Sequence, residues 1–146
     1  MKPRLHVLIC STRPGRVGPA IAAWAHEFAK SHNAFESKLV DLAAFSLPVF
    51  DEPAHPRLQK YHHPHTKAGS KSVGEADAFL FVMPEYIAHF SQHIGANSTF
   101  TPNQYQIASA TPMLDEMYRW TEALSSLEAI VFTRDLGTGS RNSRNT

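Results

Sequence analysis

The stretch LICSTRPGRVGPAIAAWAHEF, residues 8–28, decides how the rest of the chain is interpreted. It continues an apolar run that begins at residue 5, passes into a loop with two arginines, two hydroxyl side chains and two glycines, and ends in a helical pattern. A short run that is apolar throughout is typical of a strand buried on both faces of a parallel sheet. Val17, Ile21, Ala25 and Phe28 recur at helical spacing, so a helix is predicted directly after the loop.

The pattern then repeats strand and helix along the chain. In order, the predicted elements are a second strand within residues 35–45 that ends near Asp41, a proline-rich loop at 46–65, a short helix at 66–77 and a third strand at 78–83. Strand, helix, strand, helix, strand implies right-handed crossovers. The predicted fold class is therefore α/β, with a doubly wound parallel sheet.

The pattern of the last part of the chain predicts a long helix followed by a polar tail. Thr101 is expected to be the N-cap of this helix and Pro102 its first residue. Pro112 lies inside the helical pattern and either kinks this helix or begins a second one. We predict one domain over residues 1–130 and a disordered tail over residues 131–146.

Composition and charge exclude several classes of protein. The chain has 146 residues and is 42% hydrophobic, enough for one packed core. Fourteen basic residues against 13 acidic residues are too balanced to indicate nucleic-acid binding. Cys10 has no second cysteine to pair with, which favours a reducing compartment. The apolar runs are too short for a signal peptide or a membrane span, so we expect a cytoplasmic protein without a membrane partner.

The loop after the first strand has the composition of an anion-binding site. A helix N-terminus presents unpaired N–H groups and the positive end of the helix dipole. Hydroxyl and guanidinium side chains add donors, and glycines let the backbone approach a ligand. The spacing of Gly15 and Gly18 fits neither the dinucleotide fingerprint nor the Walker A loop, so a mononucleotide phosphate is favoured. An ordinary polar turn with solvated arginines is the alternative.

A second candidate site is VMPEY, residues 82–86, at the carboxyl end of the third strand. Ligands of open parallel sheets bind beyond the carboxyl ends of the strands, near the switch point of the strand order. Tyr86 can stack on a flat ring, and the backbone of Pro84 and Glu85 can contact the polar edge of that ring. Considered alone, this segment is more commonly a plain strand end.

Four segments in chain order together resemble the NADPH-dependent FMN reductase family, over most of residues 5–127: STRPGRVGPAIAAW, LVDLAAFSLPVFDEP, HTKAGSKSVGEADAFLFVMPEY and FTPNQYQIASATPMLDEMYRWTEAL. The resemblance implies a flavodoxin-like fold, and hydride transfer from NAD(P)H through FMN to a flavin, quinone or similar acceptor. By position, it places Ser11, Thr12, Arg13, Arg16, Val17 and Gly18 around the FMN phosphate, and Pro84, Glu85 and Tyr86 along the flavin ring. The cofactor carries the chemistry, so no catalytic side chain and no metal is predicted.

The chain departs from the family at one point. Members continue after this tyrosine through two more βα units, roughly sixty residues at about 30 per unit. Here Tyr86 is followed by Ile87 and then by a segment that resembles the family's C-terminal part, as after an internal deletion. Gly69 also stands where the family usually has tryptophan.

The deletion predicts a flavodoxin-like sheet truncated to about three strands plus a C-terminal helix. The third strand would become an open edge, and the flavin site would be incomplete. We therefore expect impaired activity and a homo-oligomer. The alternative function is a non-catalytic truncated isoform or an interaction partner that associates through the exposed edge strand.

Histidines cluster at His62, His63 and His65, with His55 nearby. Imidazole is a common ligand of zinc, copper and nickel. The long proline-rich loop around them offers no carboxylate or cysteine at a ligand spacing, so a solvated loop is favoured over a metal site.

Overall fold

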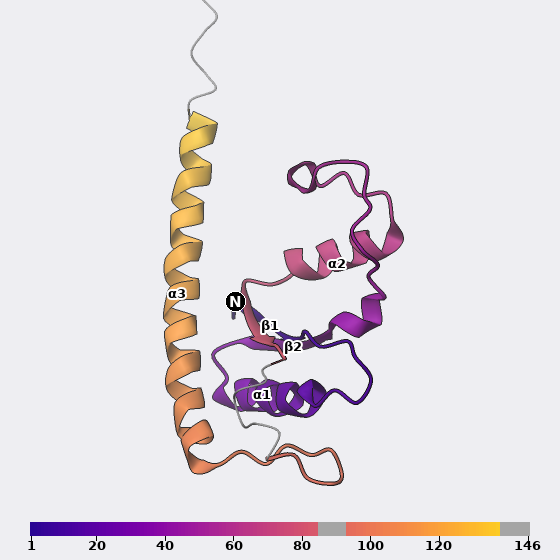
Figure 1. Cartoon of the computed structure of the whole chain (residues 1–146). Coiled ribbons are helices and arrows are strands. Elements are labelled where there is room, and N and C mark those ends of the chain that lie inside the picture. The colour runs from indigo at the N-terminus through magenta and orange to yellow at the C-terminus, as the bar shows by residue number, and fades with distance from the viewer. Residues whose placement is uncertain (85–92, 138–146) are drawn as a thin grey trace, which may run out of the picture.

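The computed structural model describes residues 1–84 and 93–137, with side chains described as far as residue 126. The elements, in chain order, are β1 (Arg4–Ile9), α1 (Gly18–His32), β2 (Glu36–Asp41), the short 3₁₀ helices η1 (Leu42–Phe45) and η2 (Pro56–Leu58), α2 (Pro64–Gly74), β3 (Ala78–Val82) and α3 (Gln104–Gly137). The predicted order of strands and helices is confirmed, and Figure 1 shows the arrangement.

The three strands form one parallel sheet in the order β2-β1-β3. The central strand β1 is buried, which explains its continuous apolar run. In the register, Leu8 lies between Val40 and Phe81, and these three side chains share one face of the sheet. The α/β fold with a truncated flavodoxin-like sheet is therefore confirmed.

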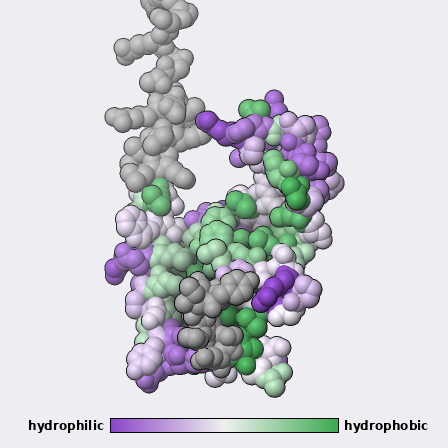
Figure 2. All heavy atoms as spheres, in the orientation of Figure 1, coloured by the Kyte–Doolittle hydropathy of each residue, from purple (hydrophilic) through white to green (hydrophobic). Residues whose placement is uncertain are grey.

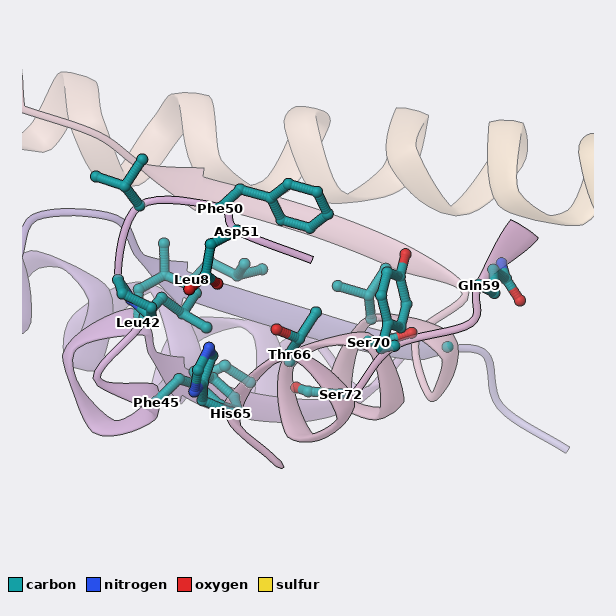
Figure 3. A pocket seen from close by; sticks show the side chains of 18 residues that line it. Leu8, Leu42, Phe45, Phe50, Asp51, Gln59, His65, Thr66, Ser70 and Ser72 are labelled. Carbon is teal, nitrogen blue, oxygen red and sulfur yellow. The ribbon is translucent and has the colours of Figure 1, made fainter. Parts of the chain in front are cut away.

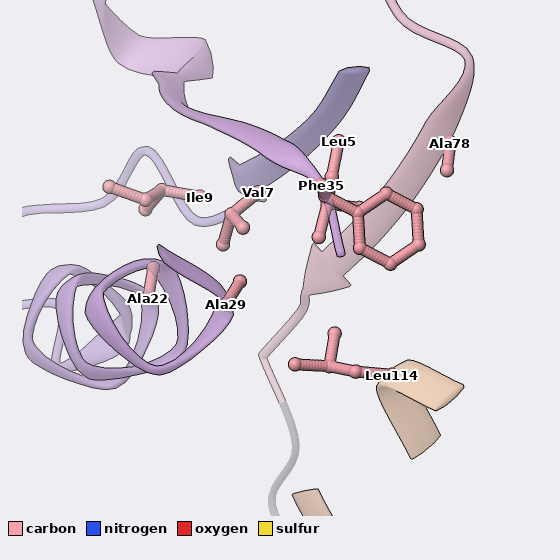
Figure 4. Close-up of a cluster of buried hydrophobic side chains, with 8 residues drawn as sticks. All are labelled: Leu5, Val7, Ile9, Ala22, Ala29, Phe35, Ala78 and Leu114. Carbon is pink, nitrogen blue, oxygen red and sulfur yellow. The ribbon is translucent and has the colours of Figure 1, made fainter. Parts of the chain in front are cut away.

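Helices α1 and α2 lie on opposite sides of the sheet (Figure 1). The core forms on the α1 side, where alternate residues of β1 meet α1, the start of β2, β3 and α3. Figure 4 shows its eight side chains: Leu5, Val7, Ile9, Ala22, Ala29, Phe35, Ala78 and Leu114. Small alanines on α1 let that helix approach β1 closely, so large residues of the strand fill the space between them.

Helix α3 packs beside α1 through its N-terminal half. Leu114 is only 1% exposed, and the ring of Tyr118 lies edge-on to Phe35 with the ring centroids 5.7 Å apart. His32 Nε2 on α1 lies 2.9 Å from Asp115 Oδ1. Among the described residues, no helix has the length and apolar character that crossing a membrane requires.

The start of α3 differs from the prediction. The helix begins at Gln104, and Asn103 rather than Thr101 caps it. The Gln106 N–H donates to Asn103 Oδ1 at 2.9 Å, and the Asn103 N–H donates to Gln106 Oε1 at 2.8 Å. This reciprocal pair is a capping box, and it satisfies two helix-end donors at once. The Thr–Pro start was therefore wrong.

Pro112 lies inside α3, which is one helix and not two. The helix continues to Gly137, so it includes residues 131–137 of the expected tail. Residues 138–146 lie outside the described part of the chain.

The α2 side of the sheet is open over β3. None of the residues of α2 is buried. Phe79 and Phe81 of β3 stack on each other on this side, with their ring centroids 6.0 Å apart, and Phe81 is 55% exposed. Figure 2 shows apolar surface, in green, gathered between the α2 layer and the lower part of the molecule.

Candidate functional site

The carboxyl ends of the three parallel strands meet at one edge of the sheet, as in other open parallel sheets. The Cys10 N–H donates to the Val82 carbonyl at 3.0 Å, which fixes the end of β1 beside the end of β3. The loop of residues 11–17 therefore begins next to Met83 and Pro84. The two segments that the sequence singles out start at neighbouring points of this edge.

The loop turns sharply before it enters α1. Gly15 has a φ of +69°, in the left-handed region that strains residues with a Cβ. Val17 is the N-cap residue, no side chain caps the helix, and a proline occupies its first turn. The uncapped N-terminus leaves backbone donors and the positive dipole end open to an anion.

The predicted phosphate-binding residues differ in exposure. The Ser11 side chain is buried at the end of β1, whereas Thr12, Arg13 and Val17 are exposed. A Cβ at Gly18 would meet only ordinary contacts, 3.6 Å from Ile9 Cγ2. The fold therefore does not itself demand glycine at position 18.

Arg16 points toward the end of β2. Its Nη1 donates to Asp41 Oδ1 at 2.7 Å and its Nη2 donates to Asp41 Oδ2 at 2.6 Å. The same Nη1 donates to the Ser11 carbonyl at 2.5 Å. Arg16 thus lies in the predicted loop, but its guanidinium is engaged by a carboxylate of this chain.

Asp41 lies beside the candidate loop through Arg16 and is not among the residues predicted from the sequence. The hydrogen bonds from Arg16 lower the pKa of Asp41 against the effect of partial burial, and the Ala43 N–H acts in the same direction as Arg16. Its position at the end of β2 was the available signal. In the order β2-β1-β3, that end lies beside the start of the loop.

The flavin-ring segment is described only in part. Pro84 follows β3 and is exposed. Glu85 and Tyr86 lie outside the described residues, so their predicted contact with a ring stays a prediction.

A cavity of about 580 Å³ lies between the sheet and the α2 layer (Figure 3). Leu8 and Val40 form its floor on the sheet, and Phe45, His65 and Gly69 are among the residues around it. A Cβ at Gly69 would lie 3.9 Å from Leu47 Cδ2 and would meet nothing nearer. The absence of a side chain at residue 69 therefore leaves space unfilled in this layer.

The histidine cluster lies at the start of α2, where His63 is the N-cap residue and His65 is in the first turn, so the expected loop does not extend to residue 65. His63 and His65 stack with their ring centroids 5.3 Å apart, and His63 Nε2 lies 3.5 Å from Asp51 Oδ1. Among the side chains of residues 1–84 and 93–126, no group of three or more histidine, cysteine, aspartate or glutamate residues could hold a metal ion. Glu52 accepts the N–H groups of His62 and His63 at 2.6 and 3.0 Å, just before α2.

The comparisons with known proteins agree with the order of elements in β1 to β3. A family model described as NADPH-dependent FMN reductase matches residues 3–92. The chain is 37% identical over 86 residues to the NAD(P)H-dependent FMN reductase C4B3.06c of Schizosaccharomyces pombe, which is 58% of this chain and 43% of that protein. It is 30% identical over 89 residues to the NAD(P)H-dependent FMN reductase ntnL of a Nectria species, which is 57% of this chain and 44% of the relative.

The family model covers the loop of residues 11–17 and all three strands. The chain spans less than half the length of the two curated relatives, and the family match ends at residue 92, before α3. The FMN reductase family uses FMN and NAD(P)H. Because the family model covers more than half of the sequence and includes every strand of the sheet, the chain belongs to the NADPH-dependent FMN reductase family.

Proposed function

We propose that this chain binds FMN and, with NAD(P)H as the hydride donor, reduces a flavin, quinone or similar acceptor. The observation that carries the proposal is the uncapped N-terminus of α1 directly after β1, with Gly15 in the left-handed conformation. A helix start of this kind binds phosphate through backbone N–H groups and the helix dipole. The residues present fit the phosphate end of FMN.

The loop side chains would hold the phosphate from several sides. The hydroxyls of Ser11 and Thr12 and the backbone N–H groups of Val17 and Gly18 are donors without charge. Arg13, which is exposed, adds a positive charge within the loop. Charge-assisted hydrogen bonds to phosphate are stronger than neutral ones, so this end of the ligand supplies most of the orientation.

The ring end of the ligand would lie beyond β3. FMN, when bound, supplies the ring that accepts hydride and passes electrons to the acceptor. Pro84, Glu85 and Tyr86 remain the proposed residues along that ring. The protein binds and orients the cofactor and needs no acid–base side chain of its own for hydride transfer.

We expect the turnover of this chain to be low. Its sheet ends at β3 in the described residues, and the match covers less than half of each curated relative. The proposed internal deletion between Tyr86 and Ile87 would remove the strands that follow β3 in the family. NADPH oxidation with added FMN is therefore expected to be far slower than in a longer member of the family.

The test of the proposed function is a comparison of FMN with riboflavin, which lacks the phosphate. We expect isothermal titration calorimetry to show tighter binding of FMN, because only FMN reaches the α1 N-terminus. Equal affinity for the two flavins would contradict the phosphate site. Absence of binding for both would contradict the proposed function as a whole.

The second candidate function is a non-catalytic isoform that associates through its edge strand, including association with a second copy. The observation that favours it is β3, which pairs only with β1 among the described residues and whose Phe81 is half exposed. Unpaired N–H and C=O groups of an uncharged strand are a template for another strand. For either function the proposed location is the cytoplasm, because a single cysteine cannot form an internal disulfide and this favours a reducing compartment.

A further inference from the structure

We propose that Asp41 is a positioning residue for the phosphate loop. Through its ion pair with Arg16, it holds residues 11–16 against the end of β2 in the shape that receives the phosphate. This inference rests on the proposed FMN-binding function and adds a residue outside the loop to it. It also gives Arg16 an indirect role in place of direct phosphate contact.

The geometry ties three separate backbone positions together. Both terminal nitrogens of Arg16 donate to the Asp41 carboxylate, at 2.7 and 2.6 Å, and Nη1 also donates to the Ser11 carbonyl at 2.5 Å. Three of the five guanidinium N–H groups are thereby used. The first residue of the loop, its sixth residue and the end of β2 are joined by one planar group.

Asp41 is itself held in a fixed orientation. It pairs with Ile9 in the strand register, which sets its backbone beside the end of β1. Its Oδ1 also accepts the Ala43 N–H at 3.0 Å and so caps η1. The carboxylate therefore meets Arg16 from an anchored strand end and not from a flexible loop.

The pair is only partly exposed to solvent. The exposed side-chain fractions are 20% for Arg16 and 32% for Asp41. Bidentate arginine–carboxylate pairs with restricted solvent access hold their geometry better than surface pairs, which contribute little. This ion pair can therefore limit the motion of the loop.

A purely electrostatic role and a positioning role for Asp41 predict opposite changes in FMN affinity when its carboxylate is removed. This difference makes the proposal testable. A carboxylate beside a phosphate site repels the phosphate, and Asp41 also neutralises Arg16. If Asp41 acted only through its charge, its removal would strengthen FMN binding. If it positions the loop, its removal weakens FMN binding even though a negative charge is lost.

The experiment compares Asp41→Asn with Asp77→Asn. Asp77 makes a matched pair with Arg4 at the opposite end of the same sheet, at 3.2 Å to Nε and 3.3 Å to Nη2. We expect Asp41→Asn to weaken FMN binding about tenfold, the order expected for one charge-assisted contact, and to leave riboflavin binding unchanged. Asp77→Asn should leave the ratio of FMN to riboflavin affinity unchanged. A general loss of structure would lower both affinities and not their ratio.

Arg16→Lys provides a second variant that keeps the positive charge. Lysine cannot form the bidentate pair, so its effect on the ratio should match that of Asp41→Asn. Tighter or unchanged FMN binding by Asp41→Asn would overturn the proposal. So would normal FMN binding by Arg16→Lys.

Trypsin gives a readout that does not require flavin. The bond after Arg13 precedes Pro14 and resists trypsin, so Arg16–Val17 is the cleavable bond of this loop. Cleavage needs the Arg16 side chain to leave Asp41 and enter the protease pocket. We expect faster cleavage at this bond in Asp41→Asn than in Asp77→Asn. Unchanged cleavage would overturn the positioning role, whereas failure of flavin binding in the parent chain alone would overturn only the proposed function.

Discussion

The two faces of the sheet are built from the same three strands but differ in how they are covered. On the α1 face, Leu5 and Val7 have no exposed surface and meet two helices. On the α2 face, Phe81 is 55% exposed, and none of the residues of α2 is buried. The sequences of β1 and β3 are apolar enough for two covered faces, but only one face is closed over β3. The difference indicates that the α1 face supplies most of the folding stability and that the α2 face over β3 is accessible to a partner.

The largest expected effect comes from breaking the closed face. Leu114→Ala should lower the free energy of unfolding by about 2–5 kcal/mol, because Leu114 is buried and its loss leaves a cavity. Leu124→Ala is the matched control, since the same residue type on the same helix is 54% exposed and should cost much less. Urea denaturation measures both. Equal costs would mean that α3 does not hold the core.

The next prediction concerns the open face. Phe81→Lys should reduce self-association by about tenfold or more, because a charge on an edge strand opposes pairing with another strand. Val73→Lys adds the same charge at an exposed position on α2 and should leave association unchanged. Sedimentation velocity of the parent chain and both variants checks this. A parent chain that stays monomeric at tens of micromolar, where exposed edges commonly aggregate, would contradict the edge model.

A smaller effect is expected in the α2 layer. Gly69→Ala should raise the free energy of unfolding by about 0.5–1 kcal/mol, because alanine favours a helix and the nearest atom to its Cβ is 3.9 Å away. Gly15→Ala should act in the opposite direction, because its φ of +69° strains alanine. The thermal unfolding midpoint should therefore rise in Gly69→Ala and fall in Gly15→Ala, relative to the parent chain. A fall in the midpoint for Gly69→Ala would show that α2 has no room for a side chain.

The smallest expected effect is a pH dependence at the start of α2. Desolvation would raise the pKa of Glu52, but hydrogen bonds from His62, His63 and Thr66 outweigh it and lower the pKa to about 2 from 4.5. A carboxyl group with a lowered folded pKa stabilises above its unfolded pKa, and this stabilisation is lost as the pH falls from about 4.5 to about 2.

Glu52→Gln should remove the loss of folding stability between about pH 4.5 and about pH 2 that is due to Glu52. It should leave the packing on the α1 face unchanged. The His62 amide resonance should follow a titration near pH 2 in the parent chain. A titration of the Glu52 carboxyl near its ordinary value would contradict the hydrogen-bonded arrangement.

Local pattern was sufficient to predict the elements of the sheet. Apolar runs predicted β1 and β3, and helical spacing predicted α1, because burial of these segments is periodic in sequence. The start of α3 was predicted wrongly because the prediction used the Thr101–Pro102 pair and did not include the Asn103–Gln106 capping box. Both patterns are local, and the one that satisfies two donors prevails.

The sequence predicted which loop forms the candidate site, but it did not predict the ion pair between Arg16 and Asp41. The loop composition indicated donors for an anion, and the structure places that loop at the carboxyl edge of the sheet. The partner of Arg16 could not be found from composition, because Asp41 reaches it through the register of two strands. Tertiary contacts of this kind depend on the fold and not on spacing along the chain.

The central place of β1 also has a consequence for the order of folding. β1 must pair with β2 across one helix, but with β3 across a chain segment more than twice as long. Each doubling of a closed loop costs about 0.6 kcal/mol of entropy, so the β1-α1-β2 unit is expected to form first. During synthesis, β3 would then remain an uncharged, unpaired strand for the longest time. The yield of correctly folded monomer would depend on whether β3 pairs with β1 before it pairs with a strand of another chain.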